Sequence, residues 1–147
     1  MPDFLETMTP KKVGIIACSG EALPEGTLTR IAARLVVEEL RPESTVIMCL
    51  PLFLAGDEGE QNFAKFFPTI CLDGCEKKCS SLGTEKYSGK PTVIIDVKKV
   101  MKEMDIRLNP EEVVELGNNG MKIARRIAEL TAEKVDEILM RIRPKDE

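Results

Sequence analysis

The sequence predicts an α/β fold: one doubly wound, Rossmann-like domain with about four parallel strands and a long C-terminal helical segment. The first observation is a set of four short apolar segments rich in β-branched residues, at 13–18, 45–50, 68–73 and 91–96. The second is that segments with helical spacing alternate with these strands. Strands that are apolar throughout and alternate with helices indicate a parallel sheet covered on both faces. Right-handed crossovers then favour the strand order 2-1-3-4.

The helices of the first half are predicted from the spacing of apolar residues. A loop that contains Pro24 and Gly26 follows the first strand, and a helix then covers 27–40. The segment 51–59 is predicted as a loop after the second strand. A helix over 60–67 comes next and ends before a proline.

The C-terminal third is predicted to be helical from residue 109 onward. Asn109 is a suitable N-cap, Pro110 suits the first helical position, and Glu112 follows the cap by three residues. The apolar stripe then runs to Ile142. The Gly-Asn-Asn-Gly segment at 117–120 is costly inside a helix and could break it in two.

Length and composition predict a single domain over 1–147, with 1–10 and 143–147 poorly ordered. A chain of 147 residues with 43% hydrophobic and 31% charged residues is ordinary for a globular protein. A net charge of −4, 4% aromatic residues and no tryptophan argue against a nucleic-acid partner. The longest apolar run, Val46 to Ala55, contains a proline and is shorter than the roughly 20 residues that cross a bilayer. We therefore expect a cytoplasmic protein with no membrane partner.

The absence of histidine restricts the chemistry more than any motif does. The chain contains five cysteines and no histidine. This excludes Ser-His and Cys-His nucleophile pairs and mixed Cys/His metal sites. The odd number of cysteines also argues against a disulfide framework. Any chemistry must use thiolates, carboxylates, lysines or backbone groups.

Four of the five cysteines are predicted to gather at one edge of the sheet. Cys18 ends the first strand, Cys49 lies near the end of the second, Cys75 follows the third, and Cys79 lies one helical turn beyond. Open α/β sheets bind ligands at the carboxyl ends of their strands. Cys71 lies within the third strand and is interpreted as a core residue.

The cysteine spacing excludes three known devices. The Cys-x-x-Cys redox motif is absent, no cysteine is followed six residues later by the arginine of a phosphatase loop, and the Walker A spacing fails. The pair Cys75 and Cys79 remains. On a helix, positions four apart lie on one face, so both sulfurs could reach one ion. A helix N-terminus would also stabilise the thiolates.

The segments ACSGEALPEGTLTRIAARLVVEEL, CLPLFLAGDEGE and PTICLDGCEKKC resemble the DGC domain family, named for a triplet that here is Asp73-Gly74-Cys75. The resemblance covers nearly the whole chain. The family is regarded as zinc-binding because of its cysteines and has no assigned biochemical role. The resemblance implies Cys18, Cys75 and Cys79 as zinc ligands, with Cys49 as the fourth.

Two further residue groups bear on the site. In the predicted strand order Cys49 lies two strand spacings, roughly 10 Å, from the end of the third strand, which makes it the weakest ligand. Asp73 could replace it as an oxygen ligand, although capping of the following helix is the competing role. Ser19 and Gly20 flank a helix N-terminus and could hold a small anionic ligand, with a plain turn as the alternative.

The leading hypothesis is a cytoplasmic metal-binding protein with a cysteine-thiolate site at the carboxyl edge of the sheet. Four thiolates suit zinc or an iron–sulfur cluster by ligand type, and the resemblance favours zinc. One alternative is a thiol-dependent redox enzyme or transferase, with Cys18 as nucleophile and Cys75 or Cys79 as resolving thiol. Another is a module that binds a protein partner through the C-terminal helix.

Overall fold

A computed structural model describes residues 12–142 of the chain. The predicted poor order of 1–10 and 143–147 concerns segments outside the described residues. The elements follow one another as β1 (Val13–Ala17), α2 (Pro24–Leu35), the π-helix η1 (Val36–Leu40), β2 (Thr45–Met48), α3 (Leu50–Leu54), α4 (Glu58–Phe66), β3 (Thr69–Asp73), α5 (Cys79–Tyr87), β4 (Val93–Asp96), α6 (Val97–Met104) and α7 (Asn118–Ile142).

The four strands form one parallel sheet in the order β2-β1-β3-β4, as the sequence predicts. Ala17 at the end of β1 is level with Leu72 of β3, and Asp73 is level with Asp96 at the end of β4. The carboxyl ends of β1, β3 and β4 therefore meet at one edge. β1 separates β2 from β3.

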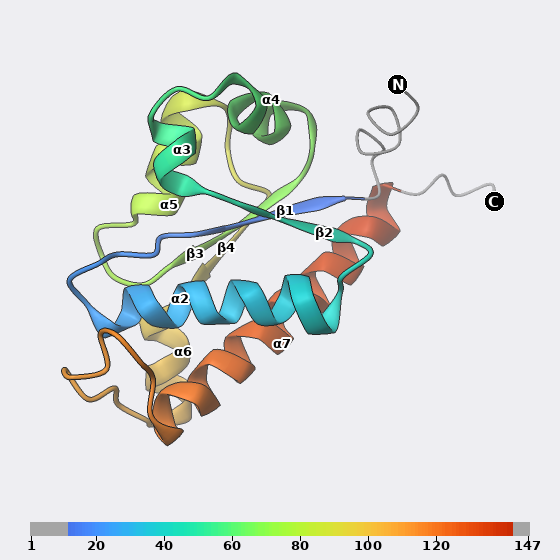
Figure 1. The fold of residues 1–147 in the computed structure, drawn as a ribbon. Helices are drawn as coiled ribbons and strands as arrows, with labels where there is room; N and C mark the ends of the chain where they lie inside the picture. The colour runs from blue at the N-terminus through green and yellow to red at the C-terminus, as the bar shows by residue number, and fades with distance from the viewer. Residues whose placement is uncertain (1–11, 143–147) are drawn as a thin grey trace.

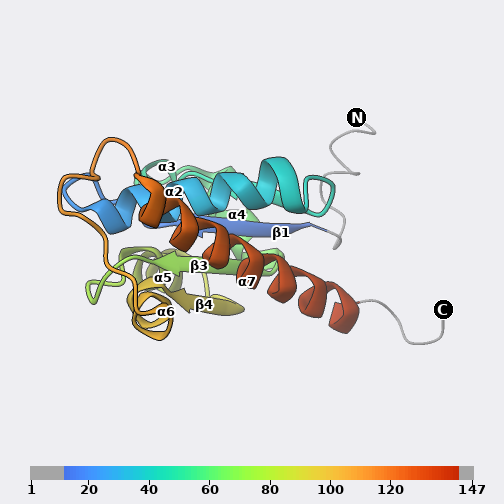
Figure 2. The ribbon, with the colours of Figure 1, turned by 90° about the horizontal axis from the view of Figure 1, so that it is seen from below.

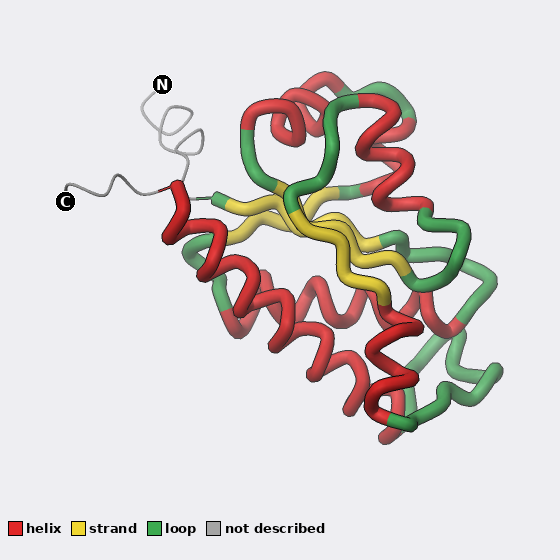
Figure 3. Tube along the Cα trace, turned by 180° about the vertical axis from the view of Figure 1, so that it is seen from behind, coloured by secondary structure: helices red, strands yellow, loops and turns green. Residues whose placement is uncertain are grey.

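Helices cover both faces of the sheet, which is the doubly wound arrangement (Figure 1). α2, α6 and α7 lie on one face and α3, α4 and α5 on the other, and the same two layers are seen from behind (Figure 3). Each layer has a separate apolar core, because side chains alternate along each strand. Ile15 and Leu72 belong to the core under α2 and α7, whereas Ile16 and Cys71 belong to the core under α3 and α4.

Three helices before residue 105 differ from the sequence prediction. α2 begins at Pro24, in the segment predicted as a loop, since proline is tolerated in the first helical turn. α3 occupies part of the predicted loop 51–59 and buries Phe53. α6 was not predicted at all. Its cap is Asp96, whose side chain accepts a hydrogen bond from the Lys99 amide at 3.2 Å.

The final helix begins at Asn118, eight residues after Pro110, the predicted first helical position. The Asn109 side chain accepts from the Glu111 amide at 2.9 Å, and the Asn109 amide donates to Glu112 at 2.8 Å. These bonds make the expected capping box, but the chain forms only a turn there. The segment 117–120 does not break the helix. Instead α7 starts inside it and runs unbroken, and none of the described helices is long and apolar enough to cross a membrane.

The segment that connects α6 to α7 returns to the carboxyl edge of the sheet. Figures 1 and 2 show it beside the loop that follows β1 and the start of α2. The Thr27 hydroxyl donates to the carbonyl of Val113, which ties this segment to α2. The connections at this end of the molecule are therefore held against one another.

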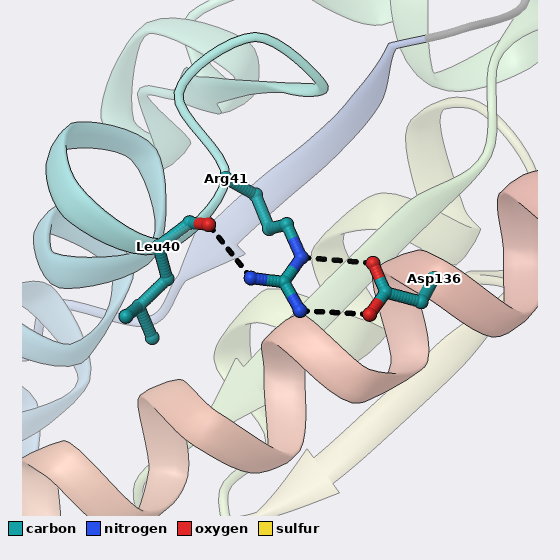
Figure 4. Close-up of polar contacts among 3 residues, drawn as sticks. All are labelled: Leu40, Arg41 and Asp136. Atoms are coloured by element: carbon teal, nitrogen blue, oxygen red, sulfur yellow. Dashed lines mark hydrogen bonds and ion pairs between the residues drawn. The ribbon is translucent and has the colours of Figure 1, made fainter.

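An ion pair joins the end of the α2–η1 helix to α7. The Arg41 guanidinium donates to both carboxylate oxygens of Asp136 at 2.8 and 2.7 Å, and to the Leu40 carbonyl at 2.7 Å (Figure 4). The hydrogen bond from Arg41 holds the pKa of Asp136 below its usual value, and the same bond raises the pKa of Arg41.

Candidate metal and ligand site

Cys18 is placed by the pairing of β1 with β3. Its amide donates to the Leu72 carbonyl at 3.1 Å, one residue beyond the end of β1. The half-buried Cys18 sulfur lies 3.5 Å from the hydroxyl oxygen of Thr29 on α2. The Thr29 hydroxyl donates its proton to the Gly26 carbonyl at 2.7 Å. Any hydrogen bond between Cys18 and Thr29 therefore has the thiol as donor.

Ser19 turns the chain from β1 toward α2. Its φ of +52° lies in the left-handed region, and its amide donates to Thr29 at 3.1 Å. That amide is consequently not free to hold a ligand. Gly20 lines a cavity at this edge. The anion site predicted at Ser19 and Gly20 stays a prediction, with Gly20 the better placed of the two.

Two glycines allow the loop after β1 to lie directly on α2. A Cβ on Gly26 would stand 2.0 Å from the Gly20 carbonyl oxygen, far inside contact distance. Gly74, which follows β3, is also closely packed, although less so than Gly26. A Cβ there would lie 3.2 Å from the Cys18 sulfur and 3.1 Å from Cβ of Glu25. The glycine of the Asp-Gly-Cys triplet thus brings the start of the β3–α5 turn against Cys18.

The prediction that Cys75 and Cys79 share one helix face is wrong. α5 begins at Cys79, and Cys75 lies in the turn before it. The Cys75 carbonyl accepts from the Lys78 amide at 3.1 Å, and Lys78 has a left-handed φ of +55°. The two cysteines therefore stand at opposite ends of a tight turn. Their sulfurs are not stacked by helical spacing.

Asp73 explains why α5 starts where it does. Its carboxylate is buried and accepts from the Ser80 hydroxyl at 2.6 Å, the Ser81 hydroxyl at 2.5 Å and the Ser81 amide at 3.2 Å. Asp73 thus has the predicted capping role, exercised on the first turn of α5 rather than at Gly74. Both of its oxygens are engaged. As a metal ligand it would have to give up these hydrogen bonds.

Three cysteines line one cavity of about 200 Å³ at the carboxyl edge, which we call the cysteine cavity. They are Cys18 from the end of β1, Cys75 from the turn and Cys79 from the start of α5. Charged residues also line it: Glu21, Glu25, Lys77 and Lys78. The two glutamates are not predicted as site residues, and their only signal in the sequence is their position in the loop and helix after the first strand.

Cys49 does not join this group. It is exposed, caps α3 through its backbone and is not among the residues that line the cysteine cavity. Its amide donates to Glu60 at 2.7 Å. Burial raises the pKa of Glu60, although this hydrogen bond acts in the opposite direction. β1 lies between Cys49 and the β3–α5 turn, in agreement with the predicted strand order.

Cys71 is a core thiol, in agreement with its predicted place within the third strand. It is fully buried in the core under α3 and α4, and its sulfur lies 3.5 Å from the Thr84 hydroxyl. Burial raises its pKa from 9.0 to about 11. This thiol is therefore protonated and inert at neutral pH.

The chemistry of the three thiols suits a thiophilic metal, but the distances between the side chains do not yet form a metal site. Three thiols around one cavity, without imidazole, are the ligand type that zinc and iron–sulfur clusters take. Among residues 12–142, however, no three Cys, Asp or Glu side chains stand close enough to hold an ion as they lie. Binding would require the three sulfurs to come closer together.

The fold and the site define a class of protein, namely a doubly wound parallel α/β domain with cysteines gathered at the carboxyl edge of its sheet. The chain belongs to the DGC domain family, whose model matches residues 14–139. The resemblance seen in the sequence is thereby confirmed, and it implies a metal-binding role. No curated protein and no solved structure matches the chain.

Proposed function

We propose that this protein binds a zinc ion in the cysteine cavity through Cys18, Cys75 and Cys79. The observation that carries the proposal is that these three thiols, one just after β1 and two at the ends of the β3–α5 turn, line the same cavity. The thiol-only donor set suits zinc or an iron–sulfur cluster, and membership of the family favours zinc. Three protein ligands would leave the fourth position of a tetrahedral zinc for water or a substrate.

Two lysines lie beside the proposed ligands. Lys77 and Lys78 stand in the turn between Cys75 and Cys79 and line the same cavity, so their positive charges would offset the negative charge of metal-bound sulfurs. A bound zinc would act as a Lewis acid toward whatever occupies its open position. Cys49, the fourth ligand suggested by the sequence, has no support from its position outside the cavity. It stays a prediction.

The five free cysteines fit a reducing compartment, for which we propose the cytoplasm. An iron–sulfur cluster would use the same thiols. Anaerobic purification followed by elemental analysis and an absorption spectrum separates the two metals. Zinc without a visible absorption band supports the proposal, whereas iron with charge-transfer bands would replace zinc by a cluster.

Substitution of Cys79 tests the ligand set. We expect Cys79→Ser to lower bound zinc several-fold, because it removes one of three ligands. Cys71→Ala is the matched control, since that thiol is buried in a core away from the cavity, and it should leave zinc content unchanged. Elemental analysis of both variants beside the wild type measures the effect. Equal loss of zinc from both would contradict the assignment.

A thiol-dependent redox enzyme is the second candidate, favoured by the close approach of Gly74 to the Cys18 sulfur, which places the adjoining Cys75 segment beside Cys18. Here Cys18 would attack a disulfide substrate, and Cys75 would release the product by forming an internal disulfide. Purified protein without metal, together with a Cys18–Cys75 disulfide detected by mass spectrometry after one equivalent of oxidised glutathione, would favour this function over zinc binding.

A further inference from the structure

A second cavity lies beside the cysteine cavity, and nothing in the proposed metal site uses it. Its volume is about 300 Å³. Glu25, in the first turn of α2, lines both cavities, so they are direct neighbours. We call the second one the basic cavity. Its other walls come from α6 and the residues just after it, and include Lys98, Met101, Lys102, Asp105 and Arg107.

The end of α6 gives this cavity a fixed shape. Asp105 has a left-handed φ of +59°, and the Ile106 amide donates to the Met101 carbonyl at 3.2 Å. The chain therefore folds back on the last turn of the helix, and Arg107 becomes part of the same wall as Lys102. Ile106 and Met101 pack against the core under α2 and α7, which holds this wall in place.

The charge of the lining is positive although the chain as a whole carries −4. Three cations, Lys98, Lys102 and Arg107, face two carboxylates, those of Glu25 and Asp105. Lys98 is 3.4 Å from Glu76, in an exposed pair. Within the described part of the chain, Lys102 and Arg107 form no side-chain hydrogen bond or ion pair. Their charges are available to a ligand.

We infer that the basic cavity binds the anionic group, a phosphate or a carboxylate, of a small molecule whose other end enters the cysteine cavity. Arg107 offers the planar donor pair that matches either anion, and Lys102 adds a second charge. The inference rests on the proposed function only in taking the cysteine cavity as the place of reaction. It assigns the anion to residues other than Ser19, whose amide already donates to Thr29.

Substitution of Glu25 tests the inference in the opposite sense to substitution of the cations. Glu25 lines both cavities, so its negative charge would oppose an anion bound beside it. Neutralising Glu25 should therefore strengthen anion binding, while neutralising Lys102 and Arg107 should weaken it. A purely structural role for these exposed residues would not give opposite effects.

The first experiment is a titration with inorganic phosphate at low ionic strength, followed by amide chemical shifts in NMR spectra. We expect the K102Q/R107Q variant to bind phosphate roughly fivefold or more weakly, and E25Q to bind it more tightly. The matched control is K65Q/K99Q, which removes two exposed lysines outside the cavity and changes the net charge equally. Equal weakening in both double variants, or no binding by the wild type at millimolar phosphate, would overturn the inference.

The second experiment asks whether the two cavities serve one molecule. Metal-free protein is treated with an anionic aromatic disulfide, dithiobis-nitrobenzoate, or with neutral dithiodipyridine. A cavity thiolate attacks one reagent sulfur, a mixed disulfide forms, and the other sulfur leaves as a coloured thiolate or thione. The measured quantity is the rate of reaction with the anionic reagent divided by the rate with the neutral one, at Cys18, Cys75 and Cys79. We expect K102Q/R107Q to lower this ratio, and K65Q/K99Q to lower it less. An equal change of the ratio in the two double variants would refute the link between the cavities. Failure of the protein to bind zinc would not change this ratio, because the experiment uses metal-free protein.

Discussion

The buried thiol of Cys71 should make the folded protein less stable at high pH. The folded protein keeps this thiol neutral up to a pKa of about 11, whereas its ordinary pKa is 9.0. Between these values the unfolded chain loses the proton and the folded chain retains it, so stability falls as pH rises. The two-unit difference corresponds to about 2–3 kcal/mol.

Urea unfolding of wild type and Cys71→Ala between pH 8 and pH 11 measures this contribution. At pH 8 the variant should be less stable by about 1 kcal/mol, because a small cavity replaces the sulfur. The difference should shrink or reverse by pH 11, since only the wild type has this thiol to ionise. Ile70→Val, which trims a fully buried neighbour without a titratable group, should show a constant difference. A constant difference for Cys71→Ala would contradict the raised pKa.

Single residues were predicted well where their role follows from position along a strand. Cys71 within β3 and the capping role of Asp73 are of this kind. The partnership of Cys75 with Cys79 failed, because Ser80 and Ser81 fix the start of α5 through Asp73 and leave Cys75 in a turn. That outcome depends on a buried carboxylate and two hydroxyls meeting in space, which spacing alone does not reveal.

At the scale of elements, the pair of Arg41 with Asp136 fastens α7 to the end of the α2–η1 helix (Figure 4). The pair is bidentate but partly exposed, so solvent screens it. We expect Asp136→Asn to lower the free energy of unfolding by about 0.5–1 kcal/mol, and by less in high salt. Because Arg41 lowers the pKa of Asp136, the contribution is present above the ordinary carboxylate value of 3.8 and is lost as pH falls through the lowered one.

Urea unfolding at low and high salt checks this expectation. Glu137→Gln on the same helix is the control. Its carboxylate is 3.4 Å from Lys134 and 4.0 Å from Arg141, both on α7, so it joins no second element. It should cost less than Asp136→Asn. Equal losses for the two variants would show that the Arg41–Asp136 pair contributes no more to the free energy of unfolding than an ion pair within one helix.

Helix boundaries were the weakest part of the sequence prediction, and the reasons differ between elements. At Asn109 the expected capping bonds form, yet the segment is held as a turn where Thr27 binds the Val113 carbonyl. α6 does not stand out in the sequence because charged and polar residues surround its few apolar positions, of which Val97 and Val100 are buried. A tertiary contact decides the first case and a narrow apolar stripe the second.

For the whole molecule, the strand order could be predicted because few right-handed arrangements of four buried parallel strands exist. That order in turn brings Cys18 and the β3–α5 turn to one edge and leaves Cys49 across β1. The basic cavity could not be predicted. It forms where α2, α6 and the residues after α6 meet, and its charged residues are far apart in sequence.

The fold as a whole should not depend on the metal. None of the three cavity cysteines belongs to either apolar core, and the strands are joined by backbone pairing along their whole length. A domain of this size buries enough apolar surface to fold alone. We therefore expect chelation to leave the far-ultraviolet circular dichroism nearly unchanged.

Loss of a ligand that binds only the folded state must still lower the melting temperature, because binding stabilises that state by RT ln(1 + L/Kd), where L is the concentration of free ligand. We expect a decrease of only a few degrees, measured by thermal denaturation before and after chelation. The C75S/C79S double variant, which lacks two of the proposed ligands, should melt near the chelated wild type and be insensitive to chelator. A structural zinc site gives the opposite result, since removal of its metal unfolds the chain. Unfolding on chelation would therefore show that the ion is needed for the fold, and would contradict the expectation that the two apolar cores and the strand pairing suffice.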